Sequence, residues 1–258
     1  MRNVWLIAKT VLIESVRRKE IYVVVLISLI LIGTIMSINF FDMPGLIKFY
    51  RETALRIMSL AAAVTVIVLA SRQLPREFEK RTIYPLLAKP VGRGTFLLGK
   101  FLGVILAAAF CFGIFMSIFI GGTIYLGVAI PWVHLIQYFY LQMWAMAILT
   151  LLGFFLSLLL NLDAAITMGI IFYLTANILT EGISFIYDFM GGFGKAVVII
   201  LNYSIPQLSI LDFSEKTVHA EIWQPLPPLL LFYLTLYAFA FAALYFFLTL
   251  LLFRRREL

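Results

Sequence analysis

The chain alternates long apolar stretches that carry no charge with shorter segments that are rich in charge. About 18 apolar residues suffice for a helix to cross a hydrocarbon core of roughly 30 Å. We therefore predict an all-α polytopic membrane protein with one transmembrane domain over residues 1–258. The six predicted spans are Ile21–Phe41, Ala54–Ser71, Phe101–Ile130, Leu135–Leu160, Ala164–Thr180 and Leu229–Phe253. At 1.5 Å per residue the third would be about 45 Å long, so it must tilt, bend near Gly121 and Gly122, or protrude.

Residues 1–20 show a different pattern, with apolar positions at helical spacing. These positions are Val4, Ile7, Ala8, Val11, Leu12 and Val16. One apolar face on a charged helix is typical of a helix that lies on the membrane surface. We expect an amphipathic surface helix here, before the first span.

Composition and charge support a membrane protein and give its orientation. Hydrophobic residues make up 63% of the chain and charged residues 13%, against roughly 45–50% and 25% in soluble domains. Of the 20 Lys and Arg, 15 flank one side of the predicted spans, and that side is expected to be cytoplasmic. Both termini then lie in the cytoplasm. The net charge of +7 follows from this bias and from attraction to anionic lipid, so it needs no nucleic-acid partner.

Two segments between the spans are long enough to have a role of their own. One is the basic cytoplasmic loop 72–100, and the other is the outer segment 181–228, which could re-enter the membrane or bind an extracytoplasmic partner. Within the loop, Pro75 and Pro85 bracket a stretch that fits a short amphipathic helix, with Pro75 in its first turn. Such a helix would suit a soluble partner, although a solvated loop that only sets topology fits equally well.

Catalytic chemistry is not indicated. Away from their ends, the predicted spans contain no Asp, Glu, Lys, Arg or His, which argues against a proton-driven cycle. We find no H-E-x-x-H or G-x-S-x-G motif and expect no catalytic residue and no metal site. His134 and His219 are placed in outer loops, and Cys111 is interpreted as a packing residue.

The stretch GTFLLGKF, residues 94–101, resembles a phosphate-binding loop but fails at its last position. Phe101 replaces the Ser or Thr that would hold Mg²⁺, and no strand precedes the stretch. Gly99, Gly103 and Ala107 recur every four residues, which places small side chains on one helix face. We predict close helix packing there rather than ATP binding.

The stretch EKRTIYPLLAKPVGRGTFLLGKFLG resembles the motif of ABC-2-type transporter permeases, in which a Glu-x-x-Thr segment leads into L-L-x-K-P-V-x-R-x-x-F-L-L-G-K. The residues that match are Glu79, Thr82, Leu86, Leu87, Lys89, Pro90, Val91, Arg93, Phe96, Leu97, Leu98, Gly99 and Lys100. Permeases associated with multicopper-enzyme maturation are the most similar in appearance. The resemblance implies that residues 1–20 are the connecting helix of this family. It also implies a coupling helix that docks on an ATPase through Arg76, Glu77, Phe78, Glu79, Lys80, Arg81 and Thr82.

The resemblance further implies how the chain works. Two permease chains, most simply a homodimer, would each bind a separate ABC ATPase subunit that holds ATP and Mg²⁺, and the permease would bind no cofactor itself. The expected function is export across the cytoplasmic membrane of a prokaryote. The alternatives are a membrane scaffold or mechanotransmitter for an assembly or maturation system outside the cytoplasm and, less favoured, an intramembrane enzyme.

Overall fold

The computed structural model describes residues 2–17, 22, 26, 29, 30, 33, 46–79, 92–186, 191–195 and 205–255. These residues form helices joined by turns and contain no strand. The elements are α1 (Arg2–Val16), α3 (Leu46–Glu79), α5 (Arg93–Tyr125), α6 (Trp132–Leu159), α7 (Leu162–Ile186), the 3₁₀ helix η3 (Leu208–Leu211), α9 (Ser214–Val218) and α10 (Pro228–Arg255).

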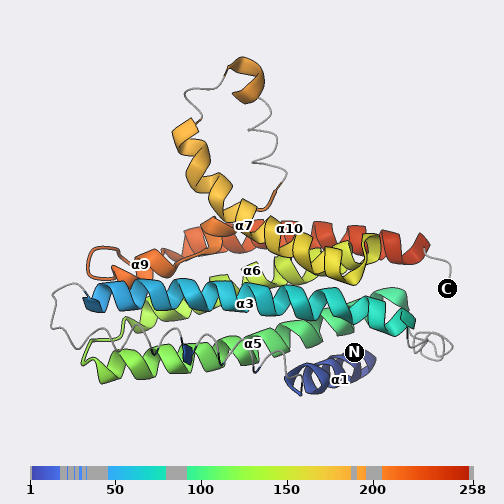
Figure 1. Ribbon diagram of the computed structural model, residues 1–258, viewed down its shortest axis with the longest axis horizontal. Helices are drawn as coiled ribbons and strands as arrows, with labels where there is room; N and C mark the ends of the chain where they lie inside the picture. The colour runs from blue at the N-terminus through green and yellow to red at the C-terminus, as the bar shows by residue number, and fades with distance from the viewer. Residues whose placement is uncertain are drawn as a thin grey trace.

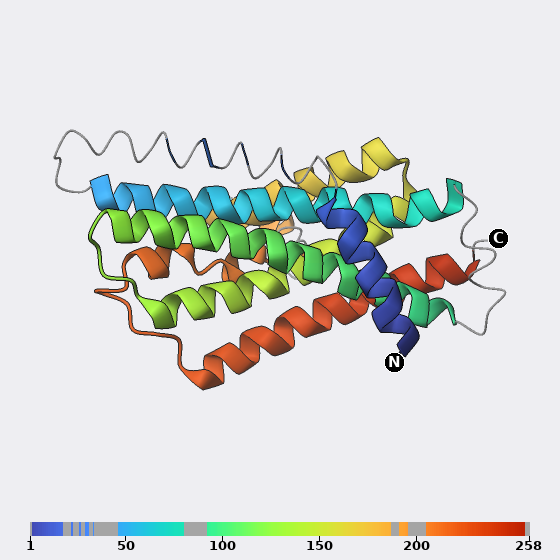
Figure 2. The ribbon, with the colours of Figure 1, turned by 90° about the horizontal axis from the view of Figure 1, so that it is seen from below.

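The long helices form a bundle in which α3, α6 and α10 run in one direction and α5 in the other, with α6 between α3 and α10 (Figure 1). Helix α3 contacts α5, α6 and α7, while α10 packs mainly on α6. Helix α1 crosses α5 obliquely near the end of the bundle that holds the C-terminus (Figure 2). We call this end the C-terminal end of the bundle, and the end that holds η3 and α9 the opposite end.

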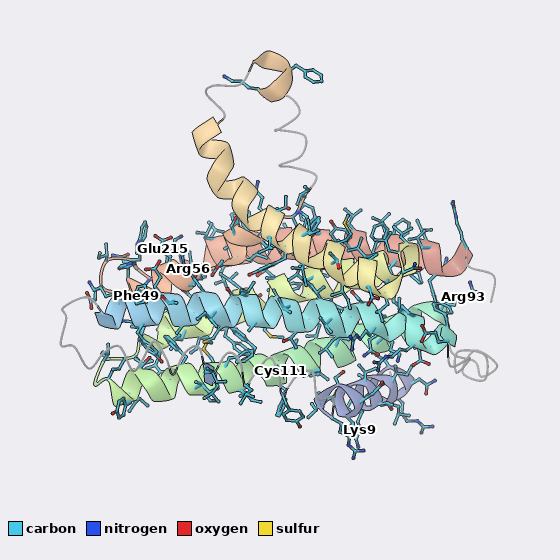
Figure 3. The ribbon with its side chains drawn as sticks, viewed as in Figure 1. Lys9, Phe49, Arg56, Arg93, Cys111 and Glu215 are labelled. Carbon is cyan, nitrogen blue, oxygen red and sulfur yellow. The ribbon has the colours of Figure 1, made fainter. Side chains whose placement is uncertain are left out.

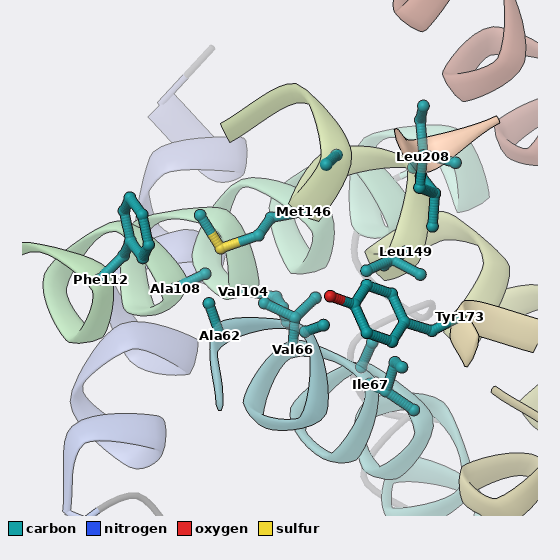
Figure 4. Close-up of a cluster of buried hydrophobic side chains, with 14 of the residues drawn as sticks. Ala62, Val66, Ile67, Val104, Ala108, Phe112, Met146, Leu149, Tyr173 and Leu208 are labelled. Carbon is teal, nitrogen blue, oxygen red and sulfur yellow. The ribbon is translucent and has the colours of Figure 1, made fainter. Parts of the chain in front are cut away.

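Apolar side chains from four helices and η3 meet in the middle of the bundle (Figure 4). Helices α3, α5 and α6 contribute residues three or four positions apart, as a helix with one buried face requires, and α7 contributes Tyr173. The members shown are Ala62, Val66, Ile67, Val104, Ala108, Phe112, Met146, Leu149, Tyr173 and Leu208. Cys111 is also buried, as its interpretation as a packing residue predicted.

Four helices, α3, α5, α6 and α10, are long and apolar enough to span a membrane. They coincide with four of the predicted spans. The described side chains of α7 form a shorter apolar helix, Leu162–Ala176, and predicted span 21–41 lies largely outside the described residues. An integral membrane protein is therefore supported, while the count of six spans stays a prediction.

The prediction of a loop over residues 72–100 included helical residues at both of its ends. Helix α3 continues to Glu79 and α5 begins at Arg93, so both ends of the predicted loop are helical. The backbone hydrogen bonds of a helix are satisfied within it, so the helix need not stop where charged residues begin. Pro75 lies inside α3 and does not begin a separate helix, at the cost of one backbone hydrogen bond. The rest of the predicted coupling helix, beyond Glu79, lies outside the described residues.

The described part of predicted outer segment 181–228 divides in two: the end of α7 projects away from the bundle, whereas η3 and α9 fold back onto it (Figure 1). Helix α7 continues to Ile186, and α9 packs on α3 and α6. The placement of His134 in a loop was wrong, because it lies in the first turn of α6, where it is buried and within 3.0 Å of the Trp223 carbonyl oxygen. Gln137 exchanges two 3.0 Å hydrogen bonds with the backbone of Leu226. These contacts hold residues 223–226 against α6.

Candidate coupling site at the junction of α1, α3 and α5

The predicted small-residue face of α5 lies directly against α1. A Cβ added at Gly103 would stand 2.5 Å from Val11 Cβ and 2.8 Å from the Ala8 carbonyl oxygen. One added at Gly99 would stand 2.8 Å from Ile7 Cβ. Such distances are far below normal van der Waals contact. The two glycines therefore let the α1 backbone approach α5, and Ala107, one turn further on, is also fully buried.

Lys100 is buried beside this contact and bonded to α3. Its Nζ lies 2.5 Å from Glu77 Oε1 and 3.3 Å from Gln73 Oε1, and only 4% of Lys100 is exposed. The sequence analysis placed Lys100 at the end of the predicted cytoplasmic loop 72–100. A buried ammonium group needs a counter-charge, and Glu77 supplies it from a neighbouring helix. The pair fixes the end of α3 relative to the start of α5.

Further contacts join α1 and α10 to the same end of α3. Arg76 Nη1 lies 3.6 Å from Glu14 Oε1 on α1. The Phe78 ring stands 6.1 Å from the Phe253 ring of α10. Arg93 donates hydrogen bonds to the backbone carbonyls of Phe253, at 3.1 Å, and Arg254, at 2.7 Å. The last turns of α3 therefore contact α1, α5 and α10 together.

The residues predicted to dock on an ATPase now divide into three groups. Arg76, Glu77 and Phe78 face partners inside the chain, as described above. Glu79 is exposed at the end of α3. The predicted members Lys80, Arg81 and Thr82 lie outside the described residues.

The phosphate-binding loop suggested by GTFLLGKF has no counterpart in the fold. Residues 93–100 form the first two turns of α5, and Lys100 points into the α3 contact rather than toward a ligand. Among the described residues, no group of three His, Cys, Asp or Glu side chains could hold a metal ion. The described part of the chain thus offers packing and ion pairs at this junction.

A sequence model of the family described as "ABC-2 family transporter protein" matches residues 5–258. This chain belongs to the ABC-2 transporter family. The match spans nearly the whole chain and confirms the resemblance drawn from the motif around Lys89–Arg93. ABC-2 membrane proteins typically work with an ABC ATPase partner. A search of curated proteins found no match.

Several parts of the junction could not be found from the sequence. Glu77 and Lys100 are 23 positions apart, across the segment 80–91, and nothing in the pattern pairs them. Two glycines that the sequence analysis did not single out also lie close to α3. A Cβ added at Gly153 of α6 would stand 2.9 Å from Ala70 Cβ, and one added at Gly169 of α7 would stand 2.7 Å from Ile67 Cγ2. Glycine inside an apolar helix is the one signal that could have marked them.

Proposed function

We propose that this ABC-2 family protein is the permease subunit of an exporter whose energy comes from a separate ATPase subunit. The observation that carries the proposal is the family match over residues 5–258 on a bundle of membrane-length helices. ATP and Mg²⁺ belong to the partner in this scheme, and the chain itself has no ATPase site. The direction of transport follows the family resemblance.

The junction of α1, α3 and α5 suggests how the ATPase would act on the membrane helices. Glu79, together with Lys80, Arg81 and Thr82, would contact the ATPase surface. Helix α3 is continuous from there into the bundle, so a displacement of its end acts on the whole helix. Arg76, Glu77 and Phe78 would pass the same displacement to α1, α5 and α10 through the contacts already described.

The assembly is proposed to contain two copies of the chain in the cytoplasmic membrane of a prokaryote, with both termini in the cytoplasm. The contacts bring together residues that the charge pattern assigned to one side. Arg93 donates a hydrogen bond to the Arg254 carbonyl oxygen at the C-terminal end of the bundle, and Lys48 forms an ion pair with Glu221, at 3.6 Å, at the opposite end. Figure 3 labels Arg93 at the first end and Arg56 and Glu215 at the second. This grouping supports the predicted topology. Lipid and the second copy would share the exposed apolar faces of α5 and α10.

The test is to purify the tagged chain gently from native membranes and to identify its partners by mass spectrometry. We expect a stoichiometric soluble protein with complete nucleotide-binding motifs. In the reconstituted complex, Glu79→Ala should leave insertion and thermal stability unchanged and lower the ATPase activity that depends on the permease. Glu221→Ala, an exposed carboxylate at the opposite end, is the matched control.

The outcome also separates the exporter from the alternative. Wild-type coupling in Glu79→Ala would remove Glu79 from the docking surface. An ATPase that binds and hydrolyses ATP without moving any solute or lipid, in the presence of an extracytoplasmic partner, would favour the mechanotransmitter. Recovery of the chain without any ATPase, despite native lipid and ATP, would contradict both the exporter and the coupling scheme.

A further inference from the structure

A cavity of about 280 Å³ lies at the opposite end of the bundle, between α3, α7 and the segment that contains η3 and α9. Its α3 wall holds Arg56, Ser59 and Leu60, and its α7 wall holds Tyr173 and Leu174. The third wall is polar and consists of Ser209, Asp212, Ser214 and Glu215. Figure 3 shows Arg56 and Glu215 close to one another at this end.

The walls carry opposite charges. Arg56 is paired with Glu52 on its own helix at 3.0 Å, yet 61% of its side chain is exposed, so its other N–H groups can reach a ligand. Asp212 accepts a hydrogen bond from the Ser214 backbone N–H through Oδ1. Ser209 Oγ is buried and has no hydrogen-bond partner. A buried hydroxyl without a partner is costly, which favours a ligand that can bond to it.

The cavity is polar on the side of α9 and apolar on the side of the bundle centre. Leu60 and Leu174 line it and are each 44% exposed. Ile171 and Met168 follow Leu174 on α7 at intervals of three residues toward the middle of the bundle, and each is 49% exposed. Residues three or four positions apart share a helix face. An apolar track therefore leads from the cavity along α7.

We propose that this cavity binds the headgroup of a zwitterionic lipid that carries a primary amine, of the phosphoethanolamine class. The Arg56 guanidinium receives the phosphate, and the carboxylates of Asp212 and Glu215 receive the ammonium. The acyl chains lie along Leu174, Ile171 and Met168.

Charge and hydrogen bonding select this class. A simple anion would face two carboxylates, and a simple cation would face Arg56, so a ligand with both charges fits best. A primary ammonium donates up to three hydrogen bonds, which suits the carboxylates and the Ser209 hydroxyl. A trimethylammonium group donates none and is recognised by aromatic cages, whereas Tyr173 is the single aromatic residue that lines the cavity among the described residues.

The test measures lipid binding to the purified full-length chain by native mass spectrometry. The probes are phosphatidylethanolamine, its N-methyl and N,N-dimethyl forms, and phosphatidylcholine, all with the same acyl chains. Because each methyl group removes one N–H donor, we expect affinity to fall along the series, by about tenfold in total. The double variant Asp212→Asn/Glu215→Gln should flatten this slope, because an amide oxygen accepts a hydrogen bond from an ammonium group more weakly than a carboxylate does, and Asn can still accept from the Ser214 N–H. Glu221→Gln, outside the cavity, should retain it.

Two further measurements complete the test. Arg56→Gln should weaken all four lipids to a similar extent, because they share the phosphate. Free phosphoethanolamine that displaces the lipid would identify a soluble zwitterion as a ligand of the same site, whereas failure to displace it supports the lipid. Equal binding of all four lipids to the unchanged protein overturns the proposal, and so does a slope that is equally steep in the double variant. The measurement involves neither ATPase nor transport, so it fails or succeeds independently of the exporter.

Discussion

The approach of α1 to Gly103 gives the sharpest test of the junction, because α5 also contains an internal control. Gly103→Ala would place a methyl group 2.5 Å from Val11 Cβ and 2.8 Å from the backbone oxygen of Ala8. Neither atom can rotate away. An alanine at Gly113, in the same helix, would meet no heavy atom within 4 Å.

The expected magnitude follows from these two sites. Carbon atoms in contact normally lie about 3.5–4.0 Å apart, so α1 must move away by about 1 Å. Overpacking of this kind costs about 1–3 kcal/mol. Replacing glycine by alanine within a helix returns up to about 1 kcal/mol at either position. Because that gain is common to both variants, the difference between them isolates the contact, and we expect about 1–3 kcal/mol.

Limited trypsin digestion reads this difference locally. Lys9 is exposed on α1 and points away from the bundle (Figure 3), so cleavage after it requires α1 to open. A loss of about 2 kcal/mol raises the open population, and with it the cleavage rate, by about 30-fold. Gly113→Ala should be cleaved at the wild-type rate. Equal cleavage rates in the two alanine variants would refute the packing of α1 on Gly103.

Three other predictions concern the remaining contacts. Glu77→Gln leaves the Lys100 ammonium buried without its counter-charge and should cost about 3 kcal/mol of unfolding free energy; adding Lys100→Met should recover most of this loss in denaturant titration. Gln137→Ala removes both hydrogen bonds to Leu226 and should lower the free energy of unfolding by about 1–2 kcal/mol. Gln137→Glu should be intermediate, because a carboxylate can accept a hydrogen bond but not donate one. Equal stability of the unchanged protein and the two variants would count against the contact. ATP photolabelling of the isolated chain should be absent, since Lys100 is buried, and specific labelling near residues 94–101 would restore the nucleotide-binding interpretation.

The positions of the membrane helices could be predicted because they depend on composition alone. A run of apolar residues must be buried in lipid or protein wherever it lies, so the four long helices were found at nearly their true places. Their ends were predicted less well. Charged residues such as Arg72 and Arg93 were assigned to a loop, although a helix satisfies its own backbone and continues past the membrane at no penalty.

The partner of each polar side chain could not be predicted in this way. Arg76, Glu77 and Phe78 had the composition of a docking surface, and the pattern could not show that α1, α5 and α10 stand beside them. The small-residue face of α5 was visible, but the sequence did not reveal that its partner would be the N-terminal helix. The cavity at Arg56 is formed by three segments that are distant in the chain, so no local sequence pattern predicts it.

Helix α3 carries Arg56 near one end and Glu79 at the other, on one unbroken length of backbone. The 23 intervening steps correspond to about 35 Å. If the helix pivots as a lever about its Glu79 end, a tilt of only about 10° swings Arg56 sideways by roughly 6 Å. That is more than the reach of a hydrogen bond. In the proposed scheme, a tilt of α3 caused by the ATPase at Glu79 would therefore break the contact between Arg56 and the lipid phosphate, so that ATP hydrolysis would control lipid binding at the far end of the helix.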